Sequence, residues 1–172
     1  RNAPLVSACH RLEMVRAAIA GNPRFALDSA EIESGRPTFT VPTLQRLRAT
    51  YGTERPLVLI SGADSFLTLP TWRDWRSIFA LASIAVAARP GFVIDRGSMD
   101  PLLGPEFDAR QGPIAALAGA PAGRIAVFPL EPLLGDAVCM LELGVEKCRE
   151  DFGGQVAAAD IYPGVLVDLA AK

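Results

Sequence analysis

The sequence predicts an open, doubly wound α/β sheet, built as one domain over residues 1–172. Three segments are apolar at nearly every position, without the alternation of a half-exposed strand: residues 56–61 (PLVLIS), 83–88 (SIAVAA) and 124–130 (RIAVFPL). Such segments are typical of central strands in a parallel sheet, which are buried on both faces. Segments with helical character alternate with them, which favours a parallel sheet with helices on both faces. A chain of 172 residues can also bury a core without disulfides.

Helix signals dominate the chain before the first of these strands. Ser7 can cap a helix that ends near Gly21, with Pro23 just beyond its end. The apolar residues of this helix fall on one face: Ala8, Leu12, Val15 and Ile19. Residues 25–27 then predict a short strand, and residues 33–37 (ESGRP) predict a loop.

A second helix begins near Thr40. Pro42 suits the first turn of a helix, because the N–H that proline lacks has no partner there. Leu44, Leu47 and Tyr51 share one face of this helix.

Composition excludes several classes of partner. The net charge of −2 gives no argument for nucleic acid or a membrane surface, and the longest apolar run, residues 78–88, is too short to span a bilayer. Cys9, Cys139 and Cys148 are odd in number and lack metal-ligand spacing. We therefore expect reduced thiols, no protein metal site and a cytoplasmic location. The sequence leaves open whether the protein forms a homo-oligomer.

The ends of two predicted strands carry candidate site residues. In open parallel sheets, ligands bind outside the carboxyl ends of the strands, beside the N-termini of the following helices. After the first strand, Gly62 lets a ligand approach the backbone and Asp64 offers a carboxylate to ribose hydroxyls. The alternative for Asp64 is an N-cap of a helix that starts near Ser65. After the second strand, Arg89 offers a planar fork to a phosphate or carboxylate, and its alternative is an ordinary surface charge.

Trp72 and Trp75 are the two tryptophans of the chain, three positions apart. On a helix they would share one side. We expect one of them in the core, whereas the other could offer a flat face to an aromatic ring. Core packing of both is the alternative that the spacing alone favours.

Longer blocks resemble a known family. Residues 34–52 (SGRPTFTVPTLQRLRATYG) and 59–91 (LISGADSFLTLPTWRDWRSIFALASIAVAARPG) are similar to the motifs SG-x-PSYT-x-DTL, G-x-D-x-x-x-x-LP-x-W and RPG of bacterial nicotinate-nucleotide adenylyltransferases. With residues 10–25 (HRLEMVRAAIAGNPRF), the resemblance runs from about Pro4 to Gly91. It implies a Rossmann-like nucleotidyltransferase fold.

The resemblance also implies a reaction. ATP would donate AMP to the phosphate of nicotinate mononucleotide, with Mg²⁺ assisting, and deamido-NAD and pyrophosphate would be the products in NAD biosynthesis. No covalent intermediate is expected, because one phosphate attacks the α-phosphorus in line. Such chemistry rests on positioning and charge stabilisation.

On the nicotinate side, the resemblance implies four contacts. Thr40, preceded by Phe39 in the place of the family's Tyr, would meet the nicotinate carboxylate through its hydroxyl and backbone N–H. Trp72 would stack on the pyridine ring, and Arg89 would lie near the mononucleotide end of the pocket. A two-donor contact to a carboxylate suits nicotinate, because an amide would lose the charge-assisted part.

On the ATP side, the resemblance implies that Gly62 and Asp64 hold the ribose of the adenylyl group. His10 is the only histidine, but it lies in the HRL-x-M block and not in the family's phosphate-binding H-x-G-H motif. We interpret His10 as a structural or surface residue rather than a catalytic one, and the catalytic residues stay unassigned.

The sequence departs from the family pattern in two places. The family's G-x-F-DP-x-H-x-GH segment would precede Arg1, so we expect the sheet to lack its first strand and phosphate loop. The family's ISST-x-IR segment would fall in residues 133–154, which contain no Ser or Thr and diverge from the family. The alternative function is a catalytically dead or truncated relative that only binds a pyridine mononucleotide or a partner subunit. Residues 162–172 resemble the family's final helix.

Overall fold

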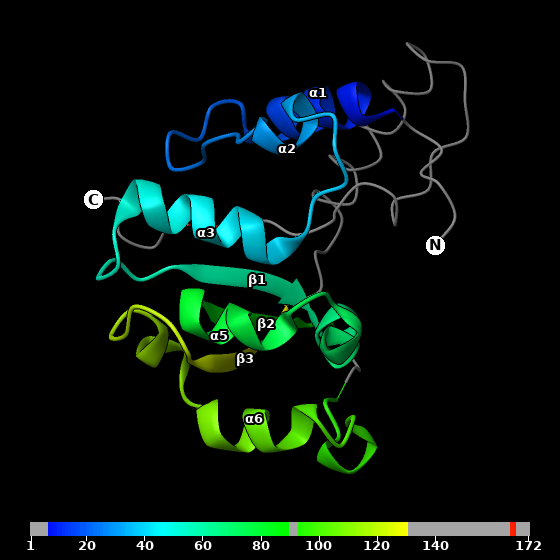
Figure 1. The fold of residues 1–172 in the computed structure, drawn as a ribbon, viewed down its shortest axis with the longest axis vertical. Helices are drawn as coiled ribbons and strands as arrows, with labels where there is room; N and C mark the ends of the chain where they lie inside the picture. The colour runs from blue at the N-terminus through cyan, green and yellow to red at the C-terminus, as the bar shows by residue number, and fades with distance from the viewer. Residues whose placement is uncertain (1–6, 90–92, 131–165, 168–172) are drawn as a thin grey trace. The chain divides into compact units, whose positions relative to one another are not determined.

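The computed structural model describes residues 7–89, 93–130 and 166–167 (Figure 1). These residues fall into two compact units. The first holds residues 7–36, and the second holds the described residues from 37 onward. The expectation of one domain over residues 1–172 stays a prediction.

The first unit begins with the predicted capped helix, α1 (Ala8–Ile19). The Ser7 hydroxyl accepts a hydrogen bond from the backbone N–H of His10 at 3.3 Å, as an N-cap does. All four residues of the predicted apolar face of α1 are half-buried. A second helix of one turn, α2 (Ala30–Glu33), follows and was not predicted.

The predicted strand at residues 25–27 is wrong. These residues form no strand, and Phe25 is 44% exposed. The backbone N–H of Phe25 donates to the carbonyl of Asn22 at 3.1 Å, so a turn takes the donor that a sheet partner would need. Three apolar residues in a row indicate a strand only if a neighbouring strand is there to pair with them.

The second unit contains every other described element: α3 (Thr40–Tyr51), β1 (Val58–Gly62), α4 (Ala63–Leu67), η1 (Leu69–Thr71), η2 (Trp75–Ser77), α5 (Ile78–Leu81), β2 (Ser83–Ala88), η3 (Arg96–Ser98), α6 (Leu103–Arg110), η4 (Ile114–Leu117), β3 (Ile125–Pro129) and β4 (Leu166–Val167). The three predicted strands are confirmed to within two residues at either end.

The sheet has the strand order β3-β2-β1-β4. β1 pairs with β2 in parallel, from Val58 opposite Ser83 to Gly62 opposite Ala87, and β2 pairs in parallel with β3. The fold class is therefore confirmed as an open α/β sheet with three parallel strands. β4 adds two residues antiparallel to β1. They lie in the stretch 162–172 that resembles the family's final helix, whose other residues are outside the described ranges.

Side chains alternate between the two faces of the sheet, as the strand period requires. On one face, Leu59, Ile84 and Ile125 join the larger core, to which α3, α4, α5 and α6 contribute. On the other face, Val58, Ala85 and Ala126 pack against Leu117 of η4, in a smaller cluster. The larger core also contains Leu44 and Leu47 of the predicted helix face, together with Phe66, Trp75 and Phe79.

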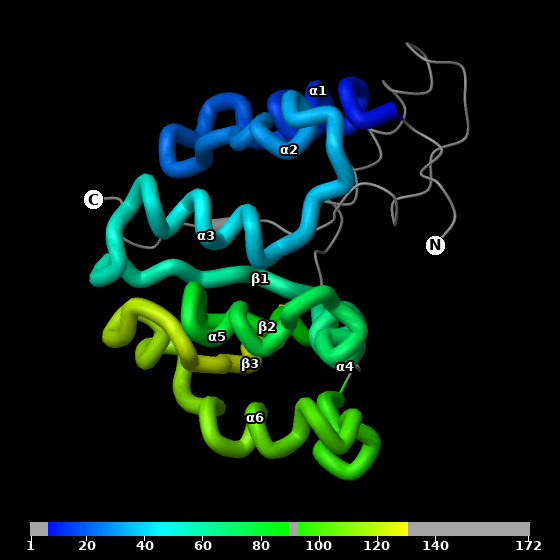
Figure 2. Tube along the Cα trace, in the orientation of Figure 1, coloured from blue at the N-terminus to red at the C-terminus, as the bar shows by residue number. Residues whose placement is uncertain are grey.

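Tyr51 shares the sequence face of Leu44 and Leu47 but lies at the end of α3, 40% exposed. The Arg55 guanidinium covers its ring at 5.2 Å. In Figure 2 the first turn of α3 and the helix α4 lie at the end of the sheet where β1 finishes. This is the edge at which the sequence predicts the site.

Candidate functional site

Gly62 ends β1 and is the N-cap of α4. A Cβ atom on Gly62 would lie 2.7 Å from Oδ1 of Asp64, so the Asp64 carboxylate folds back over the glycine. Asp64 stands in the first turn of α4, and the reading of Asp64 as an N-cap is wrong. No hydrogen bond to this exposed carboxylate is recorded within the described ranges. It is therefore available to a ligand at the end of β1.

Arg89 directly follows β2, the strand beside β1. Gly62, the last residue of β1, is paired with Ala87, so Arg89 stands two residues beyond the last pair of β1 and β2. The side chain is exposed, and among the residues that the structure describes it has no ion pair. The following turn, Pro90–Gly91, lies outside the described residues. The register brings Arg89 to the same edge of the sheet as Gly62.

Phe39 and Thr40 form the start of α3. Phe39 is the N-cap in an extended conformation, and its side chain cannot cap the helix. Pro42 has no N–H, and the first turn contains no acidic residue. The N–H groups at the start of a helix have no partner within it and carry partial positive charge. The half-buried Thr40 thus presents a hydroxyl beside backbone donors that no side chain caps.

Trp72 and Trp75 occupy different environments, as one of the two sequence interpretations expects. Trp75 is 6% exposed and meets Phe79 edge to face, with ring centroids 6.0 Å apart. Trp72 is half-buried and packs against the larger core from outside. Its indole Nε1 is buried without a hydrogen-bond partner among the described residues. A buried unpaired donor is costly and uncommon, so Trp72 is the more unusual of the two.

One contact links the start of α3 to the tryptophan segment. The Arg73 guanidinium lies over the Phe39 ring, 5.0 Å from its centroid. Thr40 follows Phe39 and Trp72 precedes Arg73, so this contact brings together the two segments that carry Thr40 and Trp72. The sequence did not predict it, because no helix or strand period relates the two segments.

His10 and Cys9 lie in the first unit. His10 is half-buried, with its backbone capped by Ser7, and Cys9 is an exposed free thiol. Cys139 and Cys148 lie outside the described residues. Within the described ranges, no three His, Cys, Asp or Glu side chains gather as metal ligands, and no helix is long and apolar enough for a membrane span.

Comparison with known proteins decides the family. A family model described as cytidylyltransferase-like matches residues 1–129. The chain belongs to the cytidylyltransferase-like family. This membership makes it a relative of transferases and confirms the resemblance drawn from the motifs between Pro4 and Gly91.

Individual cytidylyltransferase-like relatives carry a more specific name. Proteins named probable nicotinate-nucleotide adenylyltransferase are 41% identical over 169 residues in Dechloromonas aromatica (strain RCB), 46% identical over 108 residues in Chromobacterium violaceum and 41% identical over 132 residues in Laribacter hongkongensis (strain HLHK9). These alignments cover 98%, 63% and 76% of this chain. They cover 74%, 50% and 59% of the relatives, so the chain spans half to three quarters of their length.

Proposed function

We propose that this protein transfers AMP from ATP to nicotinate mononucleotide, in the biosynthesis of NAD. An oxygen of the mononucleotide phosphate attacks the α-phosphorus of ATP, and the bond from that phosphorus to the oxygen bridging to the β-phosphate breaks. The products are deamido-NAD and pyrophosphate. The observation that carries the proposal is the convergence of Gly62, Asp64 and Arg89 at the ends of two adjacent strands, in a chain whose relatives bear this enzyme's name.

The nicotinate mononucleotide is proposed to lie between the start of α3 and the segment of Trp72. The Thr40 hydroxyl and the first N–H groups of α3 donate to the ring carboxylate, while Phe39 and Trp72 supply aromatic surface to the pyridine. Arg89 serves the mononucleotide phosphate end. The uncapped helix start favours a negative ligand group, and the exposed Arg89 has no acidic partner among the described residues.

ATP is proposed to bind at the end of β1. Gly62 lets the nucleotide approach the backbone, and the Asp64 carboxylate accepts hydrogen bonds from the ribose hydroxyls. Mg²⁺ commonly binds through one or two carboxylates together with substrate phosphates. We propose that Mg²⁺ arrives with ATP and lowers the charge repulsion between its phosphates. A cytoplasmic location accords with this metabolic role, and self-association is a separate proposal that gel filtration would test.

A matched pair of threonine variants tests the proposal. Thr40→Val keeps the side-chain shape and removes the hydroxyl, whereas Thr50→Val makes the same change at the exposed far end of α3. Loss of one hydrogen bond to a carboxylate should weaken nicotinate mononucleotide binding about tenfold. Calorimetry should show this loss for Thr40→Val and unchanged affinity for Thr50→Val.

Activity is measured separately, as deamido-NAD formed from ATP and nicotinate mononucleotide with Mg²⁺. Turnover by the full chain supports the proposed reaction. Binding of nicotinate mononucleotide without ATP binding or turnover would favour the alternative, a relative that only holds a pyridine mononucleotide. Binding of neither substrate would overturn both.

A further inference from the structure

Four arginines of the second unit lie over aromatic rings: Arg55, Arg73, Arg76 and Arg110. The last two also pair with an acid. Arg76 covers Trp75 at 4.6 Å and lies 3.7 Å from the Glu106 carboxylate. Arg110 covers Phe79 at 4.6 Å and bonds the same carboxylate at 2.8 Å. Arg73 covers Phe39 at 5.0 Å but has no acidic partner in the described part of the chain. Its charge is oriented by a ring and left without a counter-charge.

The backbone around Arg73 is fixed on both sides. The N–H of Trp72 donates to the Leu69 carbonyl at 2.9 Å, and the N–H of Ser77 donates to the Asp74 carbonyl at 3.0 Å. Asp74 has a φ of 53°, the one positive φ among non-glycine residues of the described ranges. This conformation costs free energy for a residue with a side chain. The turn at Asp74 thus holds the base of the Arg73 side chain between the two tryptophans.

Arg73 also adds to the positive end of α3. The ring that it covers belongs to the N-cap of that helix, and the helix has no acid in its first turn. A guanidinium and a helix N-terminus repel each other unless an anion lies near both. Both groups only donate hydrogen bonds, so an anionic ligand group with acceptor oxygens, a carboxylate or a phosphate, would satisfy them.

We propose that Arg73 determines specificity for nicotinate over nicotinamide mononucleotide by binding the ring carboxylate. The inference rests on the proposed function, since it assigns a further residue to the same pyridine site. The uncharged amide of nicotinamide would leave the Arg73 charge uncompensated. Phe39 positions Arg73 through its ring face, which is the part of this side chain that a cation contacts.

The test compares Arg73→Gln with Arg76→Gln, a second ring-bound arginine on the same segment. Calorimetry of the full chain measures the Kd of both mononucleotides. We expect Arg73→Gln to weaken nicotinate mononucleotide about tenfold and leave nicotinamide mononucleotide within twofold, which lowers the preference between them. Arg73→Lys should restore part of the preference, and Arg76→Gln should leave it unchanged.

The outcomes separate this inference from the proposed function. If the unmodified chain prefers nicotinate mononucleotide and Arg73→Gln keeps that preference, the role of Arg73 is overturned and the proposed function stands. An equal loss for both mononucleotides also overturns it, because the shared phosphate would then be the group bound. If the unmodified chain binds neither mononucleotide, the proposed function fails and the inference fails with it.

Discussion

At the residue scale, Gly62 and Asp64 share one small volume. Gly62 has a φ of −64° and ψ of 152°, which any residue can adopt, so backbone freedom does not require glycine here. What a side chain would meet is Oδ1 of Asp64, 2.7 Å from an added Cβ. The absence of a side chain at Gly62 therefore leaves the space that the Asp64 carboxylate occupies.

Gly62→Ala should weaken ATP binding by displacing the Asp64 carboxylate. The loss should be about tenfold in Kd, the size expected when a charge-assisted hydrogen bond to a ribose hydroxyl is removed. Calorimetry with ATP measures it. Gly112→Ala is the control, because its added Cβ would meet only the Ala116 Cβ at 3.9 Å. Unchanged ATP affinity of Gly62→Ala would exclude Asp64 from the nucleotide site.

At the scale of elements, one side chain joins the segments that lead into all three parallel strands. Arg48 of α3 donates to the carbonyls of Arg55 before β1, Leu81 before β2 and Pro121 before β3. It also bonds the carbonyls of Gly52 and Thr53. Partial burial lowers the pKa of Arg48, although a guanidinium stays protonated at physiological pH. Arg48 thus connects the segments at the amino ends of the three strands, whereas the proposed site lies at their carboxyl ends.

Arg48→Lys should destabilise the second unit although the charge is kept. Lysine has three donors on one nitrogen and cannot reach carbonyls of three separate segments as the planar fork does. We expect a loss of about 2 kcal/mol in the free energy of unfolding, measured by urea denaturation. Gln45→Lys, on the exposed side of the same helix, should change it by less than about 0.5 kcal/mol. Equal effects of the two variants would contradict the role of Arg48.

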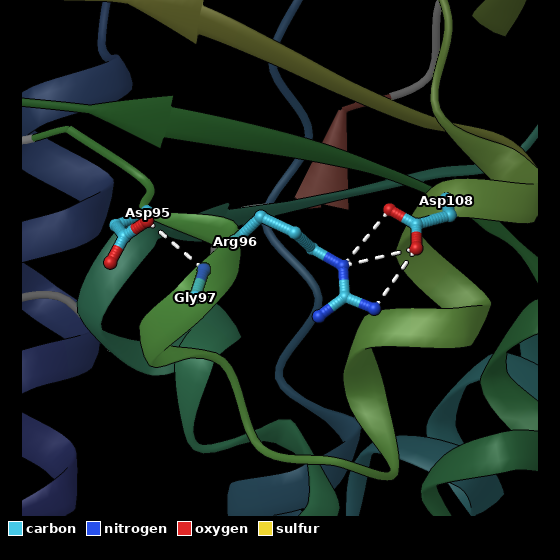
Figure 3. Close-up of polar contacts among 4 residues, drawn as sticks. All are labelled: Asp95, Arg96, Gly97 and Asp108. Atoms are coloured by element: carbon cyan, nitrogen blue, oxygen red, sulfur yellow. Dashed lines mark hydrogen bonds and ion pairs between the residues drawn. The ribbon is translucent and has the colours of Figure 1, made fainter.

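An ion pair between Arg96 and Asp108 connects η3 to α6 (Figure 3). The Arg96 guanidinium bonds both carboxylate oxygens of Asp108, at 2.9 to 3.0 Å, and Asp95 accepts from the N–H of Gly97 at 3.0 Å. A Cβ on Gly104 of α6 would lie 2.3 Å from the Arg96 guanidinium carbon, so the flexible Arg96 side chain would have to move if residue 104 carried a side chain. The hydrogen bonds from Arg96 lower the pKa of Asp108 below its ordinary value of 3.8.

This pKa shift gives a pH dependence of stability. Because the folded-state pKa of Asp108 is the lower one, its contribution is present above about pH 4 and is lost as the pH falls through the folded value. The stability difference between the unmodified chain and Asp108→Asn should therefore shrink from pH 6 to pH 3 in urea denaturation. Arg96→Gln should behave alike, and the double variant should add little. A difference that is constant with pH would contradict the pair's contribution.

The same scale shows what the sequence could predict. Strands β1, β2 and β3 were predictable because each is apolar on both faces, and α1 and α3 because each has a capping or turn residue and a helical apolar face. The helix α2 has one turn, which is too short to show a helical period. Residues 25–27 have no neighbouring strand to pair with, and a local sequence pattern cannot show whether such a strand exists. Gly62, Asp64 and Arg89 follow from the strand-end rule. The contact of Arg73 with Phe39 lies next to the turn at Asp74. A single aspartate in the sequence does not predict the positive φ of that turn.

At the scale of the molecule, all the proposed substrate-binding residues belong to the second unit: Phe39, Thr40, Gly62, Asp64, Trp72, Arg73 and Arg89. One core cluster joins the elements that carry them, with Leu44 of α3, Phe66 of α4 and Val86 of β2 among its members. The hydrogen bonds of Arg48 connect the segments at the other end of the same sheet. A ligand at the strand ends would thus contact three elements that already share a core.

Nicotinate mononucleotide should therefore raise the melting temperature of the second unit as a whole. A ligand that binds only the folded state at one hundred times its Kd adds about 2.7 kcal/mol. For a chain of this size that corresponds to an increase of about 5–10 °C, measured by differential scanning calorimetry. Nicotinamide mononucleotide at the same concentration should give a smaller increase, because it lacks the ring carboxylate. Hydrogen exchange should slow at the start of α3 and in the segment around Trp72 together, since the mononucleotide is proposed to lie between them. Slowing at α3 alone would mean that the mononucleotide does not reach Trp72, and the proposed stacking on that ring would be wrong.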